Sequence, residues 1–223
     1  MSRVRSRSAV QFPPEYFRRY DESSDELFYS LPRLVVHIDD EAIAAVTQLY
    51  SELLPESGQV LDLMSSWRSH LPHSFKGKVS ALGMNAEEMR QNPQVDTFVV
   101  QNLNRTPQLP YADQTFDGAV CTVSVQYLVD PIAVFKEVRR TLKPEAPFII
   151  TFSNRCFPTK AVAIWQVTSM AQKAALVASY LEAAGFAEIR AEDRSPQARR
   201  GWFGAGSGDP VIGVWGRRPL SDL

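Results

Sequence analysis

A carboxylate, two hydroxyl groups and an indole stand close together in the stretch VLDLMSSW, which begins at Val60. The apolar run 60–63 is typical of a buried parallel strand, and the turn after such a strand is a common site for nucleotide-containing ligands. These turns use glycine, because a side chain keeps the backbone away from the ligand. This turn contains no glycine. A ligand bound here would instead meet the side chains of Asp62, Ser65, Ser66 and Trp67.

Few residues offer metal or redox chemistry, since the chain has three histidines and two cysteines. His70 and His73 have nearly the spacing of metal ligands, but Pro72 between them breaks the helical face that would present both. Cys121 and Cys156 are isolated, which argues against a disulfide framework or a CxxC site and fits a reducing compartment. We therefore expect no metal site.

The composition is that of a globular protein with one large domain. The chain has 223 residues, of which 44% are hydrophobic and 22% charged, with a net charge of -1. This balance gives no basic bias toward nucleic acid. The longest apolar runs, such as 148–152 and 161–165, are far shorter than the roughly 20 residues of a membrane span, and the N-terminus lacks an apolar signal core. We expect a cytoplasmic monomer or homodimer without nucleic-acid or membrane partners.

From residue 59 onward, short apolar strands alternate with helical stretches. The expected strands are QVLDL, KVSALGM, TFVVQNL, FDGAVCTVSV, PFIITFS, FAEIRAED and VIGVWGRR. A short helix should begin after Asn85, with Glu88 at capping-box spacing, and a long helical region should end at Gly185. The alternation predicts right-handed βαβ units and a doubly wound, mainly parallel sheet with helices on both faces. Ligands in such sheets bind beside the carboxyl end of the first strand.

Residues 1–55 are predicted to form an N-terminal helical cap on an α/β domain that spans residues 56–223. The cap should consist of PPEYFRRYDESSDELFYS and IDDEAIAAVTQLYSELLP, and apolar residues recur at helical spacing in the second piece. We expect this segment to pack on the main domain and to bring Tyr29 and His37 over the ligand site. The loop 194–210 is interpreted as a solvated hairpin loop, and the alternative is that its Arg199, Arg200 and Trp202 contact a ligand.

Several of these segments together resemble the class I S-adenosylmethionine-dependent methyltransferases of the type 11 subgroup. The resemblance covers roughly residues 58–218 and is most specific in LPYADQTFD followed by VFKEVRRTLKP. The words DLMSSW, GMN and FSNRCFPTK are similar to a less characterised branch of that subgroup. The resemblance implies a seven-stranded, Rossmann-like sheet with an antiparallel last strand, and S-adenosylmethionine as the cofactor.

The sequence departs from the family pattern around the expected cofactor. The family's DxGxG motif aligns with 62–66, the acid that usually holds the ribose hydroxyls falls at Gly83, and the acid beside adenine falls at Asn102. S-adenosylmethionine carries no pyrophosphate, so the phosphate cradle that makes glycine valuable in dinucleotide folds is not needed. The resemblance implies a cofactor site made of Asp62, Ser65, Ser66, Trp67, Gly83, Asn85, Asn102 and Leu103. For Asn85 a helix N-cap is the alternative role, and for Trp67 the filling of a core gap.

Methyl transfer needs alignment, exclusion of water and, for a protonated nucleophile, a base. The candidate catalytic residues are Tyr127 and Gln126, after the fourth strand, and His37, whose ordinary pKa suits a base near neutrality. Structural roles for Tyr127 and His37 are the alternatives. Arg68 is a candidate for the methionine carboxylate. Asn154 and Arg155 should lie where the fifth strand opens into the pocket. Arg155 and Lys160 could attract an acidic or phosphorylated acceptor, and the alternative is a pair of loop charges exposed to water.

The sequence therefore predicts an S-adenosylmethionine-dependent methyltransferase with a small-molecule acceptor. The alternative is a methyltransferase-like binding or regulatory protein without catalysis. A nucleic-acid methyltransferase is disfavoured, because SVQYL stands where a (D/N)PP(Y/F) motif would follow the fourth strand.

Overall fold

The computed structural model describes residues 12–196 and 208–221. At its centre is one seven-stranded sheet with the order β3-β2-β1-β4-β5-β7-β6. The strands are β1 (Gln59–Leu63), β2 (Lys78–Gly83), β3 (Thr97–Val100), β4 (Gly118–Thr122), β5 (Pro147–Phe152), β6 (Ala187–Asp193) and β7 (Ile212–Arg217). β1 to β5 run parallel, whereas β7 is antiparallel to β5 and β6. The predicted sheet is confirmed, including its antiparallel last strand.

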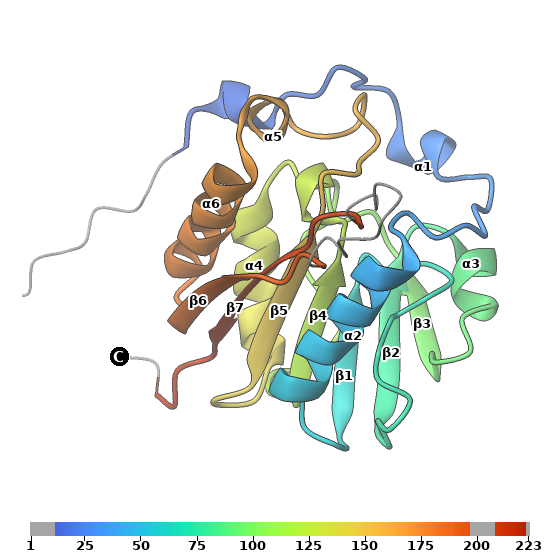
Figure 1. Ribbon diagram of the computed structural model, residues 1–223, viewed down its shortest axis with the longest axis vertical. Helices are drawn as coiled ribbons and strands as arrows, with labels where there is room; N and C mark the ends of the chain where they lie inside the picture. Colours follow the sequence, from blue (N-terminus) through green and yellow to red (C-terminus); the bar gives the residue numbers. More distant parts are fainter. Residues whose placement is uncertain (1–11, 197–207, 222–223) are drawn as a thin grey trace, which may run out of the picture.

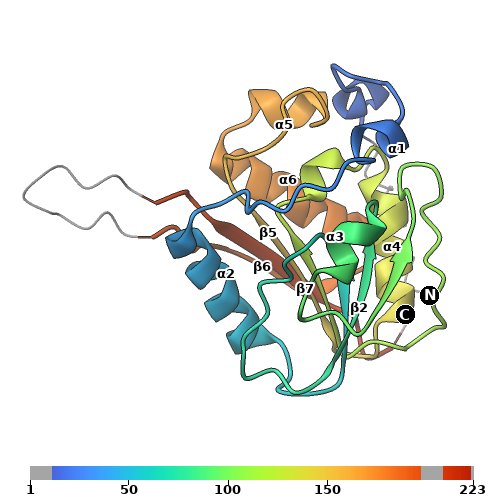
Figure 2. The same ribbon diagram turned by 90° about the vertical axis from the view of Figure 1, so that its right-hand side faces the viewer.

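Helices cover both faces of this sheet (Figures 1 and 2). The helical elements are η1 (Pro14–Phe17), α1 (Asp25–Phe28), α2 (Asp40–Leu53), α3 (Ala86–Arg90), η2 (Val125–Tyr127), α4 (Pro131–Thr141), α5 (Ala163–Val167) and α6 (Met170–Ala183). Leu49 of α2 packs with Ile149 on one face, and Val138 of α4 and Leu181 of α6 pack with Ile150 on the other. Neighbouring strand residues thus supply the two cores. None of the described helices is both long and apolar enough to span a bilayer.

The helical region predicted to reach Ala184 as one piece is two helices. The chain becomes extended at Thr168, and Ser169 then caps α6 in a full capping box with Gln172. The side chains of Thr168 and Ser169 can hydrogen-bond to nearby backbone groups, which competes with a continuous helix and favours an interruption between α5 and α6. Gly185, with a φ of +85°, ends α6 as predicted.

The first piece of the predicted N-terminal cap is not mainly helical, so that prediction is wrong. Only the short η1 and the single turn α1 form there, and the described residues 12–37 otherwise run as an extended segment that we call the strap. Between these two turns its backbone bonds to another part of the chain: the Asp21 N–H donates to Thr159 O (2.8 Å), and the Ala163 N–H donates to Arg18 O (2.8 Å). The second piece forms α2, as expected.

The strap crosses above the carboxyl ends of the parallel strands (Figure 1). It begins on α6, where the rings of Phe12 and Phe17 lie 5.2 and 6.1 Å from that of Tyr180. It then passes the loop before α5 and ends at α2. The strap therefore covers the edge of the sheet at which a doubly wound fold binds its ligand.

Lys160 holds the strap in place from below. Its side chain is fully buried, its Nζ donates to Ser23 O (2.7 Å), and it lies 3.2 Å from Asp21 Oδ2 and 3.4 Å from Asp25 Oδ1. Arg19 completes the cluster with a 2.6 Å ion pair to Asp25. Lys160 is thus neither a water-exposed loop charge nor a group facing an acceptor, and both predictions for it are wrong. A buried ammonium needs such partners, and the strap carries them.

Candidate functional site

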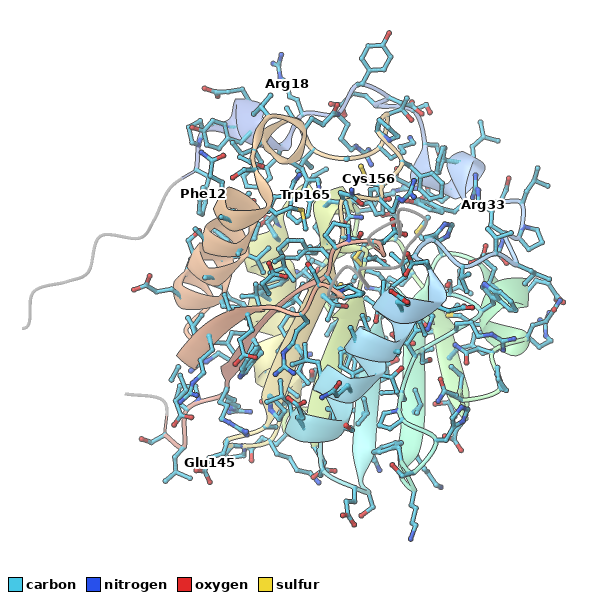
Figure 3. The ribbon with its side chains drawn as sticks, in the orientation of Figure 1. Phe12, Arg18, Arg33, Glu145, Cys156 and Trp165 are labelled. Atoms are coloured by element: carbon cyan, nitrogen blue, oxygen red, sulfur yellow. The ribbon has the colours of Figure 1, made fainter. Side chains whose placement is uncertain are left out.

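A cavity of about 300 Å³ lies beneath the strap at the carboxyl ends of β1 to β4. The strand order reverses between β1 and β4, which is the point where ligands bind in open α/β sheets. Figure 3 shows two of its lining residues, Arg33 and Cys156, at the strap end of the molecule, far from Glu145 at the opposite end. The volume is at the small end of the range for ligand pockets.

Asp62, the penultimate residue of β1, lies at the floor of this cavity and is almost completely buried. Its Oδ2 accepts hydrogen bonds from the hydroxyls of Ser65 (2.5 Å) and Ser69 (2.6 Å). Asn92 continues the network by donating to Ser69 Oγ (2.9 Å) and to Ser66 O (3.0 Å). Burial raises the pKa of Asp62 to about 6, although both hydroxyls oppose the change. No described residue donates to Oδ1, which leaves that oxygen for a cationic ligand group.

The turn after β1 has the shape of a glycine turn although it contains no glycine. Met64 adopts a φ of +57°, in the left-handed region that normally favours glycine. This conformation costs a methionine roughly 1–2 kcal/mol. The turn is held by the Ser65 N–H, which donates to Leu82 O (2.9 Å). Met64 and Trp67 line the cavity and leave it open.

Gly83, at the end of β2, stands where a ribose-binding acid was expected, and the packing explains why no acid is there. A Cβ at this position would lie 2.3 Å from Ser65 O and 3.1 Å from the sulfur of Met89. The turn after β1 therefore approaches the backbone of β2 too closely for any side chain. A ribose-binding acidic side chain at position 83 is therefore incompatible with the close packing of this turn against β2.

Substituting Gly83 with alanine is expected to lower the free energy of unfolding by about 2 kcal/mol, because the new methyl group meets a backbone oxygen that cannot move aside. The melting midpoint should fall by about 4–8 °C in a thermal scan. Gly118→Ala is the control, since its Cβ would meet the movable end of Leu54 at 2.5 Å. An equal loss of stability in both variants would contradict this explanation.

Trp67 and Arg68 form the outer wall of the cavity beside the strap. The Trp67 indole N–H donates to Val35 O of the strap (2.9 Å), and the Arg68 guanidinium lies 4.0 Å from the Trp67 ring centroid. Trp67 does not fill a core gap, because its indole joins the turn after β1 to the strap. Both side chains line the cavity, as the sequence suggested.

The three residues predicted after β2 and β3 all line the cavity, but two of them already have partners. Asn85 caps α3 by accepting from the N–H groups of Glu87 and Glu88, and its amide donates to Tyr29 O (3.0 Å). The Asn102 amide donates to Glu26 of the strap (2.9 Å). The third, Leu103, is buried, and the half-buried Asn104 beside it also lines the cavity. The N-cap role weighed for Asn85 is the one the structure has.

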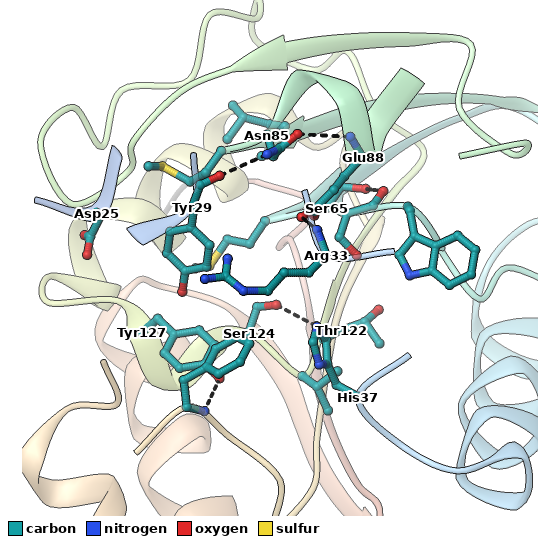
Figure 4. A pocket seen from close by; sticks show the side chains of 18 of the residues that line it. Asp25, Tyr29, Arg33, His37, Ser65, Asn85, Glu88, Thr122, Ser124 and Tyr127 are labelled. Atoms are coloured by element: carbon teal, nitrogen blue, oxygen red, sulfur yellow. Dashed lines mark hydrogen bonds between the residues drawn. The ribbon is translucent and has the colours of Figure 1, made fainter. Parts of the chain in front are cut away.

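Among the three predicted catalytic residues, His37 and Tyr127 line the cavity (Figure 4). Burial, together with the positive charge of Arg33, lowers the pKa of His37, so its imidazole is neutral near pH 7. The Tyr127 hydroxyl accepts from the Phe157 N–H (2.9 Å), and burial raises its pKa to about 12. Gln126 does not line the cavity, because its amide turns inward and donates to Val123 O (2.7 Å).

Glu88 and Arg33 are among the cavity residues that were not predicted from the sequence as site residues. Glu88 was expected to complete the capping box of α3. Instead its Oε1 accepts from the Arg33 N–H of the strap (2.7 Å), and burial raises its pKa. Arg33 follows an isolated LP pair in an extended segment, and no spacing rule marks it. Strap contacts between residues 55 positions apart have no local sequence signal.

The predicted residues after β5 differ in their relation to the cavity. Arg155 lines the cavity, but its Nε pairs with Asp209 (2.8 Å). Asn154 is exposed and does not line it. Arg199, Arg200 and Trp202 lie outside the described residues. No group of three or more metal-ligating side chains occurs among residues 12–196 and 208–221.

Comparison with known proteins agrees with the fold. A sequence model described as a methyltransferase domain matches residues 76–150. A methyltransferase from Penicillium fellutanum, phqN, is 35% identical over 79 residues, which is 31% of this chain and 23% of that protein. The chain thus matches less than a quarter of the length of this relative.

Solved structures extend the similarity to most of the chain. The [4+2]-cyclase SpnF superposes with a TM-score of 0.59 at 17% identity, covering 88% of this chain and 92% of that one. Phosphoethanolamine N-methyltransferase 2 of Haemonchus contortus, solved in complex with S-adenosyl-L-methionine, gives a TM-score of 0.56 at 12% identity, with 79% and 52% covered. The resemblance stated from the sequence is confirmed to this extent: residues 76–150 match a methyltransferase-domain model, and the chain has the seven-stranded, Rossmann-like fold of these solved structures.

Proposed function

We propose that the protein is an S-adenosylmethionine-dependent methyltransferase that acts on a small-molecule acceptor. The observation that carries this proposal is the open cavity at the switch point of the sheet, behind a glycine-free turn that keeps the shape of a glycine turn. The methyltransferase-domain match and the cofactor in a structural neighbour support the choice of ligand.

The lining of the cavity fits the chemical groups of this cofactor. Asp62 offers a carboxylate oxygen to the methionine ammonium, and Arg68 in the same turn offers a guanidinium to the neighbouring carboxylate. Glu88 offers a buried carboxylate to the ribose hydroxyls in place of the acid that Gly83 excludes. Leu103 and Met64 give apolar contacts for the adenine ring.

When bound, S-adenosylmethionine supplies an electrophilic methyl carbon on a sulfonium. The protein contributes alignment and exclusion of water, which the strap provides by closing the cavity above the strand ends. His37 carries a neutral imidazole at the rim of the cavity and would take the proton of the acceptor's nucleophile at its free nitrogen. Tyr127 would hold the loop at Phe157 and offers its hydroxyl proton toward the acceptor.

A small molecule is the acceptor that this cavity suits. The strap is bonded to the ends of β1, β2 and β3 through Val35, Tyr29 and Glu26, so a bulky chain would have to break these bonds to enter. The match to a methyltransferase of Penicillium fellutanum, over 31% of the chain, supports the reaction class.

The role of Glu88 gives a sharp prediction. Glu88→Gln is expected to weaken S-adenosylhomocysteine binding about tenfold, because a charge-assisted hydrogen bond to the ribose becomes a neutral one. Glutamine keeps the oxygen that accepts from the Arg33 N–H. Isothermal titration calorimetry measures the affinity, and Glu87→Gln on the exposed side of the same helix is the matched control. Unchanged binding in Glu88→Gln would remove this residue from the cofactor site.

A melting scan with S-adenosylmethionine or S-adenosylhomocysteine tests the proposal as a whole. Ligand at about 100 times its dissociation constant adds roughly 2.7 kcal/mol of stability, which should raise the midpoint by about 5–10 °C. No shift at millimolar ligand would refute the proposal. Binding without methyl transfer to any compound in a small-molecule extract would support the binding-protein alternative.

A further inference from the structure

The Arg33 side chain of the strap extends into the cavity among aromatic rings (Figure 4). Its guanidinium carbon lies 4.6 Å from the ring centroid of Phe28, 5.4 Å from that of Phe157 and 5.7 Å from that of Tyr29. The Phe157 ring in turn stacks on Tyr127 at 6.0 Å and meets His37 at 5.3 Å. One cation therefore stands within a cluster of aromatic side chains contributed by the strap, η2 and the loop after β5.

The hydrogen bonds of Arg33 are incomplete. Its Nη2 donates to Phe28 O (2.7 Å), which fixes the guanidinium in place. Its Nη1 is buried, and no described residue accepts from it. Glu88 accepts from the backbone N–H of Arg33, and Asp25 binds Arg19 and Lys160 instead. A buried guanidinium nitrogen without an acceptor is costly, so a ligand atom is the natural partner.

The other arginines of the cavity differ from Arg33 in where their charge is satisfied, although the Arg19 Nε is also buried with no acceptor among the described residues. Arg19 has its counter-charge in Asp25 at 2.6 Å, and Arg155 has Asp209 at 2.8 Å. Arg68 stacks on Trp67 beside Asp62, on the side where the cofactor is proposed to bind. Arg33 is therefore the cation whose charge is directed at whatever occupies the aromatic side of the cavity.

We propose that Arg33 binds a carboxylate of the methyl acceptor, and that the acceptor is an aromatic acid whose ring packs against Phe157 and Tyr29. This inference rests on the proposed function for the identity of the ligand. A planar guanidinium matches a planar carboxylate, and the adjacent rings favour an aromatic body over an aliphatic one. His37, 5.3 Å from Phe157, then stands next to the bound ring and its nucleophile.

The carboxylate of the cofactor is the other possible source of the same chemistry. In S-adenosylmethionine the ammonium and the carboxylate are attached to one carbon, so their partners must be neighbours. Asp62 and Arg68 belong to one turn, whereas Arg33 belongs to the strap and packs on Phe28 and Phe157. This placement assigns Arg68 to the cofactor and Arg33 to the acceptor.

Binding of matched acids and amides tests the proposal. The probes are benzoate, 4-hydroxybenzoate and indole-3-carboxylate, each compared with its amide, in calorimetry with and without saturating S-adenosylhomocysteine. We expect the wild-type protein to prefer the acids, and Arg33→Met to lose that preference about 10- to 100-fold, as for a lost charge-assisted pair. Arg33→Lys should keep part of it, because it retains the charge without the planar fork. Arg90→Met is the control, because Arg90 is exposed and does not line the cavity, and this variant should bind as the wild type does.

Several results would overturn the proposal. It is refuted if the wild-type protein binds no acid better than its amide, or if Arg33→Met, shown folded by its melting curve, keeps the acid preference. A second comparison uses 5′-methylthioadenosine, which lacks the amino-acid part of the cofactor. If Arg33→Met binds S-adenosylhomocysteine no better than 5′-methylthioadenosine, Arg33 serves the cofactor instead. If the wild-type protein fails to bind S-adenosylhomocysteine at all, the proposed function fails, while the acid–amide comparison without it still decides the role of Arg33.

Discussion

Replacing Lys160 with methionine is expected to lower the free energy of unfolding by about 3 kcal/mol and the melting midpoint by about 6–12 °C. Methionine fills a similar volume but donates nothing. Ser23 O loses its 2.7 Å donor, and Asp21 and Asp25 lose one of their cations. Removing one member of a buried charge cluster leaves the others unsatisfied, which costs more than the cluster contributes when intact. Arg19 remains beside Asp25 and limits the loss.

The strap should respond to this change more than the sheet does. Amide hydrogen exchange is expected to speed up in residues 18–30, which depend on Lys160, while the exchange of β4 and β5 follows only global unfolding. Lys143→Met is the matched control, because Lys143 makes an ion pair with Asp117 (2.7 Å) but is about half exposed. Such an exposed pair contributes about 0–1 kcal/mol. An equal loss of unfolding free energy in the two lysine variants would show that the burial of Lys160 does not increase its contribution to stability.

The sheet was predictable from the sequence because its signal is local. A strand covered on both faces is a continuous apolar run, as PFIITF shows, and all six of its residues are buried. The α4 helix likewise has local sequence signals, which are its apolar stripe and its N-cap Asp130. The division into segments 1–55 and 56–223 stays a prediction, although α2 from the first segment packs on the sheet core.

The strap was not predictable in the same way, since its conformation depends on distant partners. The piece DELFYS has helix-forming residues, yet only one turn forms there, because the backbone on either side bonds to the 159–163 segment and to Asn85. Lys160 was interpreted as an exposed loop charge because its partners are also distant in the sequence. Its counter-charges, Asp21 and Asp25, lie 139 and 135 positions earlier in the chain. Tertiary contact decides such segments, and sequence spacing does not report it.

The floor of the candidate site was predictable and its upper wall was not. The motif after β1 gave Asp62, Ser65, Ser66 and Trp67, all of which line the cavity. The ribose acid was looked for at the end of β2, where Gly83 excludes any side chain, while the carboxylate Glu88 lies one helical turn further on. Arg33 comes from the strap and has no motif of its own.

Replacing Asp62 with asparagine is expected to weaken S-adenosylhomocysteine binding about 100-fold at pH 7.5. The carboxylate loses its charge at the point where the ligand ammonium would bind, and a charge-assisted bond of this kind contributes roughly 1.5–3 kcal/mol. Asparagine has the same shape and can still accept from the hydroxyls of Ser65 and Ser69, so the turn should persist. Isothermal titration calorimetry gives the affinity. Asp117→Asn removes a carboxylate at the opposite end of the sheet and should leave binding unchanged.

The pH dependence of the wild-type protein gives an independent check on Asp62. Burial raises its pKa from 3.8 to about 6, so the carboxyl is ionised at pH 7.5 and mainly protonated at pH 5. The loss of the Asp62 charge should therefore lower the affinity for S-adenosylhomocysteine about tenfold between these values in the wild type. Asp62→Asn should lack this part of the fall and keep only the part due to Glu88, whose pKa is also raised by burial.

The stability of the ligand-free protein should move in the opposite direction. Because the folded pKa of Asp62 lies above the unfolded one, the cost of burying its charge is present above pH 6 and is relieved as the pH falls from about 6 toward 3.8. Asp62→Asn carries no such charge, so at pH 7.5 it should melt no lower than the wild type, and it should lack this gain on acidification. A variant that is both less stable and unchanged in ligand affinity would mean that Asp62 holds the turn and takes no part in binding.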